Sequence, residues 1–270
     1  MVRDVVDGEA PPVALVTGAA RGIGAATVGL LVGAGWRVVA FDRCADDPAL
    51  GYPLARPDDL ARLGREHGDR VATVEGDVRR QADLTAAVEL ARQAFGRLDA
   101  AVAVAGVVSG GPPLWETADE QWDALFDVNV LGVRRLAAAT IPVLLGAPQP
   151  RHGRFVAVAS AAGMLGLRRL AAYGASKHAV LGLVRGLAAD LAGTGVTANA
   201  VCPGSTRTEV LRESARIYGL ASPEEFARQA LLERLLDPEE PAALVAWLCG
   251  RSSSAVTGAA LAADGGLSTS

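Results

Sequence analysis

The amino-acid sequence predicts an α/β protein with one doubly wound, seven-stranded parallel sheet flanked by helices. Short runs of consecutive apolar residues alternate with helical segments, and no repeat or long linker divides the 270 residues. Consecutive apolar positions are typical of strands buried on both faces, and their alternation with helices favours a parallel sheet. The expected strands are Val13–Val16, Val38–Phe41, Val71–Val74, Ala100–Ala105, Phe155–Ala159, Val196–Val201 and Ala259–Ala263.

The segments between these runs carry the apolar stripe of an amphipathic helix. Apolar residues recur three and four positions apart, which places them on one helix face. The clearest stripes are Ile23, Ala26, Thr27, Leu30, Leu31 and Ala34, and Val180, Leu183, Val184, Leu187 and Leu191. We expect one domain over residues 13–270, preceded by a disordered or irregular leader of residues 1–12.

Two stretches interrupt the alternation of strands and helices. Residues 43–57 are rich in Asp and Pro, so we interpret them as an insertion without regular helix. Residues 207–236 have helical spacing that is broken by Gly219 and by Ser222–Pro223. We expect two short helices there, with Ser222 as an N-cap and Pro223 in the first turn. This second stretch is interpreted as a lid over a site at the carboxyl ends of the strands.

Composition and charge exclude several classes of function. The formal net charge is −4 without a basic block, so nucleic acid is not an expected partner. The cysteines (Cys44, Cys202, Cys249) and histidines (His67, His152, His178) lack the spacing of metal ligands or a disulfide framework. The start of the chain lacks the apolar stretch of a signal peptide, and no apolar run approaches the roughly 18 residues of a membrane span. A soluble, cytoplasmic protein without metal is expected.

The first expected strand leads directly into a glycine-rich loop, Thr17–Gly24, and then into a helix. Glycines allow a tight turn and a close approach to a phosphate, and the free N–H groups of the helix start favour an anion. The position of the loop between first strand and first helix makes dinucleotide binding the favoured interpretation. The expected contacts there are Gly18, Arg21, Gly22, Ile23 and Gly24.

Acidic residues close the second and third expected strands. A carboxylate at Asp42 can accept hydrogen bonds from both ribose hydroxyls and would repel a 2′-phosphate, which favours NAD over NADP. Arg21 and Arg43 argue in the opposite direction, since a guanidinium can bind that phosphate. Asp77, followed by Val78, is placed to meet the adenine amino group, although an N-cap role fits the spacing nearly as well.

Ser160, Tyr173 and Lys177 form a candidate acid/base group. Tyr173 and Lys177 are four residues apart at the start of a helix, hence on one face. A nearby ammonium and an oxidised nicotinamide would lower the pKa of the phenol from about 10. Tyr173 then exchanges a proton with an alcohol as hydride moves to or from the nicotinamide, while Ser160 holds the substrate oxygen.

These motifs, in this order, resemble the short-chain dehydrogenase/reductase family over nearly the whole chain from Val13 to Leu267. They are T-G-A-A-R-G-I-G from Thr17, the acidic end of the second strand, G-D-V from Gly76, A-G at Ala105–Gly106, D-V-N-V-L-G from Asp127, Ser160, Y-G-A-S-K from Tyr173, C-P-G from Cys202 and A-D-G-G from Ala263. Order and spacing together are specific, whereas a Tyr-x-x-x-Lys pair by itself is common on helix surfaces.

The resemblance implies four catalytic positions, namely Asn129, Ser160, Tyr173 and Lys177. By this resemblance Asn129 lies in a kinked helix and holds a water that begins a proton relay, and Lys177 also binds the nicotinamide ribose. The implied cofactor contacts further include Ala105, Gly106, Tyr173, Pro203, Gly204, Thr206 and Thr208. The family is usually tetrameric through the helices that carry Asn129 and Tyr173, so a homotetramer is expected.

Two features depart from the family pattern. Val104-Ala105-Gly106 stands where the family often has Asn-Ala-Gly, and the 35 positions from Asp42 to Asp77 are more than is usual. An insertion here, followed by Y-P-L from Tyr52, is similar to the mycofactocin-associated branch. That resemblance implies tightly held NAD and electron transfer to a peptide-derived redox carrier. A longer loop beside the adenine would slow NAD release by covering it.

The expected activity is that of an NAD-dependent alcohol dehydrogenase or carbonyl reductase acting on a small alcohol or ketone. An NADPH-dependent ketoreductase for acyl thioesters is the enzymatic alternative, and a dinucleotide-sensing scaffold is the non-enzymatic one. Residues 109–115, 161–172 and 207–216 are candidates to line a largely apolar substrate pocket. The apolar members are Leu114, Trp115, Met164, Leu165, Leu167 and Leu170, for which subunit or core contacts fit equally well.

Overall fold

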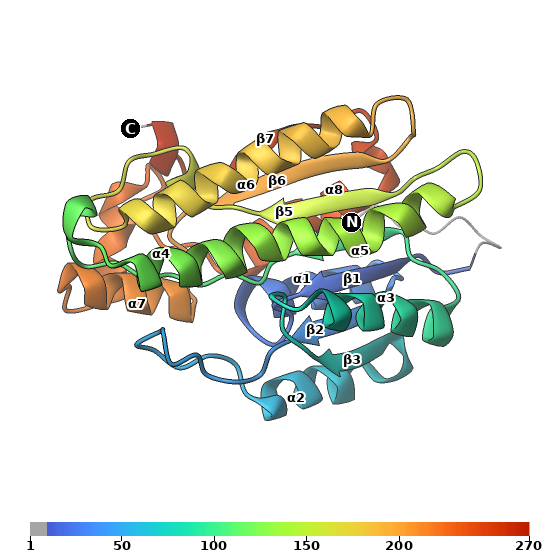
Figure 1. Cartoon of the computed structure of the whole chain (residues 1–270), viewed down its shortest axis with the longest axis horizontal. Helices are drawn as coiled ribbons and strands as arrows, with labels where there is room; N and C mark the ends of the chain where they lie inside the picture. Colours follow the sequence, from blue (N-terminus) through green and yellow to red (C-terminus); the bar gives the residue numbers. More distant parts are fainter. Residues whose placement is uncertain (1–9, 270) are drawn as a thin grey trace.

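The computed structural model describes residues 10–269 and confirms the predicted sheet (Figure 1). Seven strands pair in parallel in the order β3-β2-β1-β4-β5-β6-β7. Each strand lies within two residues of its predicted bounds. The strands are β1 (Val13–Thr17), β2 (Arg37–Asp42), β3 (Val71–Glu75), β4 (Ala100–Ala103), β5 (Arg154–Val158), β6 (Thr197–Pro203) and β7 (Ala260–Ala263).

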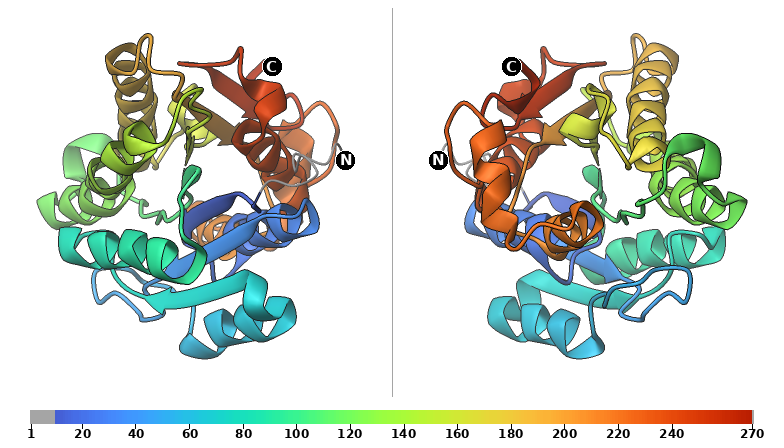
Figure 2. Two further views of the ribbon diagram at one scale, coloured as in Figure 1. Left: turned by 90° about the vertical axis from the view of Figure 1, so that its right-hand side faces the viewer. Right: turned by 90° about the vertical axis from the view of Figure 1, so that its left-hand side faces the viewer.

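Helices cover both faces of this sheet, as the end-on views show (Figure 2). They are α1 (Gly22–Gly33), α2 (Pro57–His67), α3 (Gln81–Phe95), α4 (Asp119–Phe126), α5 (Gly132–Gly146), α6 (Ala171–Asp190), α7 (Glu209–Tyr218) and α8 (Glu239–Cys249). Buried side chains of α3, α5 and α6 pack on one face, and those of α1, α2 and α8 pack on the other. The two cores that result hold the strands in place by burying apolar surface.

The strand order reverses between β1 and β4, which are neighbours in the sheet. Connections leave β1 toward β2 and β3 on one side and continue from β4 toward β7 on the other. A doubly wound sheet forms a crevice outside the carboxyl ends of the strands at such a reversal. Thr17 at the end of β1 and Ala103 at the end of β4 are paired at this point. The candidate site therefore lies above these two strand ends.

A π-helical turn, Asp127–Leu131, joins α4 to α5 in one continuous helical stretch. The stretch Asp119–Leu145 is long and apolar enough to cross a membrane by length and composition, a test that core helices of soluble proteins also pass. Here Val133, Leu136 and Leu144 are buried against the sheet. A π-turn widens a helix locally and is a common site of kinks. It therefore agrees with the kink that the resemblance implies for the helix of Asn129.

Both irregular stretches take the expected form. Residues 43–56 contain no helix, and α2 begins only at Pro57. We call Cys44–Arg56 the strap. In the second stretch, Thr208 caps α7, and Ser222 caps a short 3₁₀ helix, Pro223–Gln229. Of the expected leader, residues 1–9 lie outside the described residues.

Candidate active site

The glycine-rich loop makes a turn that only glycine can form. Gly18 has φ +68°, and a β-carbon there would lie 2.6 Å from the backbone nitrogen of Ala105. A β-carbon at Gly24 would lie 1.9 Å from the carbonyl oxygen of Gly18. Both distances are far below van der Waals contact, so side chains are excluded. The loop is thus packed tightly against the segment that follows β4, with the start of α1 facing the crevice.

The first turn of α1 has no side-chain cap, since Arg21 occupies the N-cap position without a capping hydrogen bond. This leaves N–H groups at a partially positive helix end, where a phosphate fits. The guanidinium of Arg21 instead donates to the carbonyl oxygen of Pro53 in the strap, at 2.8 Å. Arg21 therefore connects the glycine-rich loop to the strap.

Asp42 ends β2 with its carboxylate turned toward the glycine-rich loop. One oxygen accepts from the backbone N–H of Ala20 at 3.0 Å, and the other accepts from that of Cys44 at 3.2 Å. Each carboxylate oxygen can accept a further hydrogen bond. Asp42 can therefore also bind ribose hydroxyls, and it holds the loop and the beginning of the strap in place.

The end of the crevice beside β2 and β3, where the adenine is expected, carries a four-residue ion-pair network. Arg79 contacts Asp77 at 2.6 Å and Asp47 at 2.9 Å, while Arg43 contacts Asp47 at 2.7 Å and Asp77 at 3.3 Å. Burial raises the pKa of both carboxyls, but hydrogen bonds and the two guanidinium charges outweigh it, so each pKa lies below its usual value. The network ties the strap, through buried Asp47, to the loop after β3.

Asp77 is part of this network and is not a helix N-cap. Arg80 holds the N-cap position of α3, and the N–H of Arg79 donates to Asp77 at 2.9 Å. The N-cap alternative is therefore wrong. Asp77 and Val78 both line the crevice, as a contact with adenine requires.

Ser160 and Tyr173 lie together at the opposite end of the crevice. Ser160 begins a short 3₁₀ turn after β5, and its side chain accepts from the N–H of Ala162 at 3.1 Å. Burial raises the pKa of Tyr173, and a hydrogen bond with Ser160 acts in the opposite direction. Within the protein chain the desolvation of the buried phenol dominates, and the lowered pKa of Tyr173 beside an oxidised nicotinamide stays a prediction.

Lys177 lies one helical turn from Tyr173 on α6, as the spacing predicts. Its Nζ donates to the carbonyl oxygen of Val158 at 3.1 Å and lies 5.8 Å from the centre of the Tyr173 ring. Burial lowers the pKa of Lys177 to about 8, and the nearby Cys202 opposes that shift. An amine with this pKa changes its charge close to neutral pH, which suits a proton relay.

Asn129 sits in the π-turn, as the resemblance implies. Its amide forms two hydrogen bonds with the backbone of Val107, at 2.8 and 2.9 Å, and donates to Ser176 at 3.0 Å. A β-carbon at Gly106 would lie 3.2 Å from the Nζ of Lys177 and 3.4 Å from the amide oxygen of Asn129. Both polar groups thus converge on the space above Gly106.

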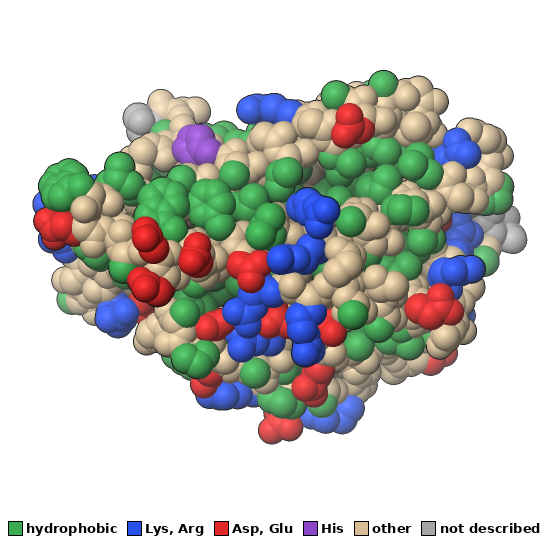
Figure 3. Space-filling model, in the orientation of Figure 1, with side chains coloured by type: hydrophobic (Ala, Val, Ile, Leu, Met, Phe, Trp, Pro, Cys, Tyr) green, Lys and Arg blue, Asp and Glu red, His purple; other side chains and the backbone are tan. Residues whose placement is uncertain are grey.

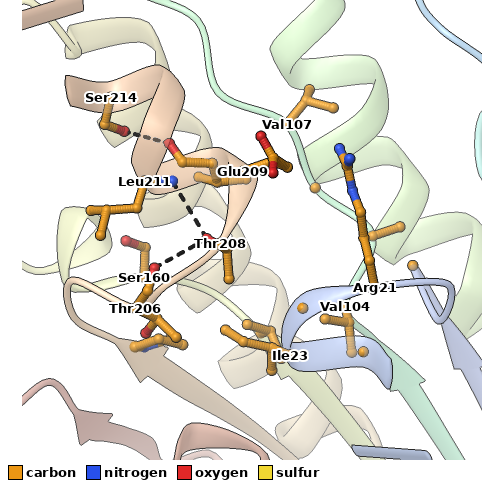
Figure 4. A pocket seen from close by; sticks show the side chains of 18 of the residues that line it. Arg21, Ile23, Val104, Val107, Ser160, Thr206, Thr208, Glu209, Leu211 and Ser214 are labelled. Carbon is orange, nitrogen blue, oxygen red and sulfur yellow. Dashed lines mark hydrogen bonds between the residues drawn. The ribbon is translucent and has the colours of Figure 1, made fainter. Parts of the chain in front are cut away.

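These groups open onto one cavity of about 500 Å³ along the strand ends. Every expected cofactor contact lines it, as do Ser160, Tyr173 and Lys177; Asn129 lies behind Val107. In Figure 4, Ser160 and Thr206 lie across the pocket from Arg21. Thr206 and Thr208 shape the turn into α7, since Thr208 donates to the Thr206 carbonyl at 3.2 Å.

The substrate end of this cavity was only partly foreseen. Leu167 and Leu170 line it, but Leu114 and Trp115 are exposed and Met164 packs on the core, so these three do not. Leu165 is also absent from its lining. Val210 and Leu211 also line it, within the predicted range 207–216. The residues that sequence reasoning missed are Tyr52, Leu54, Val107 and Tyr218, which lie outside the predicted ranges and carried only a weak apolar signal.

Comparisons with known proteins agree with this geometry. A family model described as enoyl-(acyl carrier protein) reductase matches residues 18–268. An uncharacterised NAD-dependent oxidoreductase of Mycobacterium tuberculosis is 35% identical over 263 residues, covering 94% of each chain. The crystal structure of carveol dehydrogenase from Mycobacterium avium in complex with NAD has a TM-score of 0.91 at 30% identity, covering 97% of this chain and 99% of that one.

A second solved structure, 3-ketoacyl-(acyl-carrier-protein) reductase from Brucella melitensis complexed with NADH, has a TM-score of 0.84 at 29% identity. It covers 96% of this chain and 99% of that chain. The chain belongs to the short-chain dehydrogenase/reductase family, and it is an NAD(P)-dependent oxidoreductase with a Rossmann-type fold. The glycine turn, Asp42 and the open start of α1 fit the dinucleotide.

Proposed function

We propose that the protein interconverts a secondary or primary alcohol and its carbonyl with NAD, using Tyr173 as acid/base. The carrying observation is that Ser160, Tyr173 and Lys177 meet at one end of a cavity whose other end holds Asp42. When bound, NAD supplies the hydride acceptor. Ser160 and Tyr173 then orient the substrate oxygen, and Tyr173 exchanges its proton.

Lys177 and Asn129 support this proton transfer. The amine of Lys177 is buried beside the Tyr173 ring, and Asn129 faces the same space above Gly106. A water in that space would connect Lys177 to Asn129 and carry the proton away from the phenol. The pKa of Lys177, about 8, allows its amine to accept and return a proton near neutral pH.

NAD is the proposed cofactor in preference to NADP. Asp42 presents a carboxylate at the ribose position, which opposes a 2′-phosphate. The two arginines that argued for NADP have other partners, because Arg21 donates to Pro53 and Arg43 pairs with Asp47 and Asp77, which also bind Arg79. Binding a 2′-phosphate would require breaking that ion-pair network.

We also propose that the protein holds NAD tightly and that a mycofactocin-type carrier reoxidises it. The proposal is based on the contacts of the strap. Contacts join it to the body of the protein beside the adenine end, the glycine-rich loop and the catalytic end: Asp47 with Arg79, Pro53 with Arg21, and Tyr52 with Val108. A loop held along the length of the crevice slows exit of a bound dinucleotide.

The decisive experiment is mass spectrometry of the cofactor that copurifies, followed by oxidation of carveol with an artificial electron acceptor. We expect NAD in the protein and turnover with the acceptor that exceeds turnover with free NAD. Tyr173→Phe should lower the rate by about 10²–10⁴-fold, the usual range for losing an acid/base. Full activity of that variant would instead favour the dinucleotide-sensing scaffold.

An NADPH-dependent ketoreductase for acyl thioesters is the second candidate. It is favoured by the similarity to the Brucella melitensis 3-ketoacyl reductase. Reduction of acetoacetyl-coenzyme A with NADPH at a higher kcat/KM than any alcohol oxidation with NAD would establish it.

We further propose a cytoplasmic homotetramer. Figure 3 shows hydrophobic side chains along the face of α4, α5 and α6, and Leu131, in the π-turn that joins α4 to α5, is 43% exposed. Exposed apolar surface of this kind is typical of subunit interfaces.

A further inference from the structure

The strap brings a second phenol to the catalytic end of the cavity. The backbone N–H of Val108 donates to the phenolic oxygen of Tyr52 at 3.0 Å. Tyr52 packs in the same apolar cluster as Leu170 and Tyr173, and the Tyr173 phenol raises the pKa of Tyr52 further. A residue that follows β2 by ten positions thus lies beside the acid/base.

Within the part of the chain that the structure describes, the hydrogen of this phenol is not donated to another group. Its oxygen accepts from Val108, and among residues 10–269 no acceptor is recorded for its O–H. Glu213, a carboxylate close enough to affect Tyr52, is already paired with Arg216 at 2.6 and 2.8 Å. Burial raises the pKa of Tyr52, so the phenol stays protonated and remains a donor at any working pH.

The surrounding wall leaves this donor for a ligand. Leu54, Leu167, Leu170 and Val210 line the same cavity and carry no polar side-chain atom. A donor placed beside these apolar side chains favours ligands that bring an acceptor, since a buried polar group without a partner costs binding free energy. Tyr52 differs in this respect from Tyr218, whose O–H donates to the carbonyl oxygen of Arg168 at 2.6 Å.

We propose that Tyr52 is a specificity-determining residue that donates its phenolic hydrogen to a substrate oxygen other than the reacting one. This inference rests on the proposed function. The substrate class that follows is an apolar alcohol or ketone with a second oxygen acceptor. The strap then forms part of the substrate site as well as part of the cofactor cover.

Pairs of alcohols that differ only in this acceptor test the proposal. The probes are 3- and 4-methoxycyclohexanol, each beside its ethyl analogue, which has the same shape without the oxygen. For the cofactor-loaded protein we measure affinity by calorimetry and turnover by rate. We expect one of the two methoxy isomers to bind and to turn over about fivefold better than its ethyl analogue, because one hydrogen bond provides about that ratio. Tyr52→Phe should bring both ratios to about one, whereas Thr85→Val, which removes an exposed hydroxyl of α3 outside the cavity, should leave them unchanged.

Equal binding of both members of each pair by the wild-type protein would overturn the proposal, as would an unchanged ratio in Tyr52→Phe. The wild-type ratio decides even if that variant folds poorly, which its melting curve reports. Binding with the expected ratio but without hydride transfer would instead contradict the proposed alcohol chemistry and leave the role of Tyr52 supported.

Discussion

Lys177 is a buried cation whose position carries an energetic cost. Lys177 is only 5% exposed, and its Nζ donates a hydrogen bond to the carbonyl oxygen of Val158 at 3.1 Å. Burial lowers its pKa from 10.5 to about 8 because the charged form loses hydration. Below that pH the buried lysine is charged, and its burial lowers the free energy of unfolding.

This cost predicts a pH dependence of unfolding. Between about pH 8 and 10.5 the unfolded chain binds more protons at this lysine than the folded chain, so the unfolding free energy rises with pH. In Lys177→Met that rise should be absent. The unfolding free energy of the variant should exceed that of the wild type by about 3 kcal/mol at pH 7 and equal it by pH 10.5. Urea unfolding at both pH values measures it, with Arg185→Met on the same helix as control. A pH-independent difference would contradict the assignment.

At the scale of elements, α1 contains two glycines with opposite surroundings. A β-carbon at Gly24 would strike the carbonyl oxygen of Gly18, whereas one at Gly29 meets nothing within 4 Å. Gly24→Ala should therefore destabilise the protein by about 1–3 kcal/mol and weaken NAD binding. Gly29→Ala should stabilise it by about 0.5–1 kcal/mol, because alanine is the better helix former. Thermal melts and NAD titrations of the two variants check this, and equal effects would show that the glycine turn is not closely packed.

The strap is the other element with a measurable consequence. Asp47 joins it to Arg79 after β3, while Asp46, among residues 10–269, bonds only with Arg56 and Leu54 inside the strap. Asp47→Asn should speed NAD release by about tenfold, since roughly 1.4 kcal/mol of buried ion pairing would be lost. Asp46→Asn is the matched control and should release NAD at the wild-type rate. Stopped-flow displacement of NAD decides, and identical rates in both variants would argue against the strap as a barrier.

The sequence predicted those elements whose packing imposes a periodic pattern of apolar residues. The strands and the stripes of α1 and α6 were predictable because burial on a sheet imposes a regular apolar pattern. Family motifs then located Ser160, Tyr173 and Lys177. The path of the strap was not predictable, since it depends on single contacts such as that of Tyr52 with Val108, which leave no periodic signal. The desolvation that raises the pKa of Tyr173 in the protein chain was not predictable for a related reason, because it depends on neighbours from several elements.

At the scale of the whole molecule, the apolar face of α4, α5 and α6 predicts self-association. Leu131→Glu should lower the molar mass measured by light scattering from that of four copies to that of two or one, because a charge in an apolar interface is unfavourable. Arg62→Glu on the exposed surface of α2 serves as control and should keep the wild-type mass. A wild-type protein that is already monomeric would remove this face from consideration as an interface.

The course of the strap along the crevice has a consequence for how such enzymes diversify. The strap contacts the glycine-rich loop through the hydrogen bond of Pro53 with Arg21, and it contributes Tyr52, bonded to Val108, to the proposed substrate site. We therefore expect a change in its length or sequence to alter retention of the dinucleotide and choice of alcohol together. A strap transplanted into another member of the family should therefore carry both properties with it.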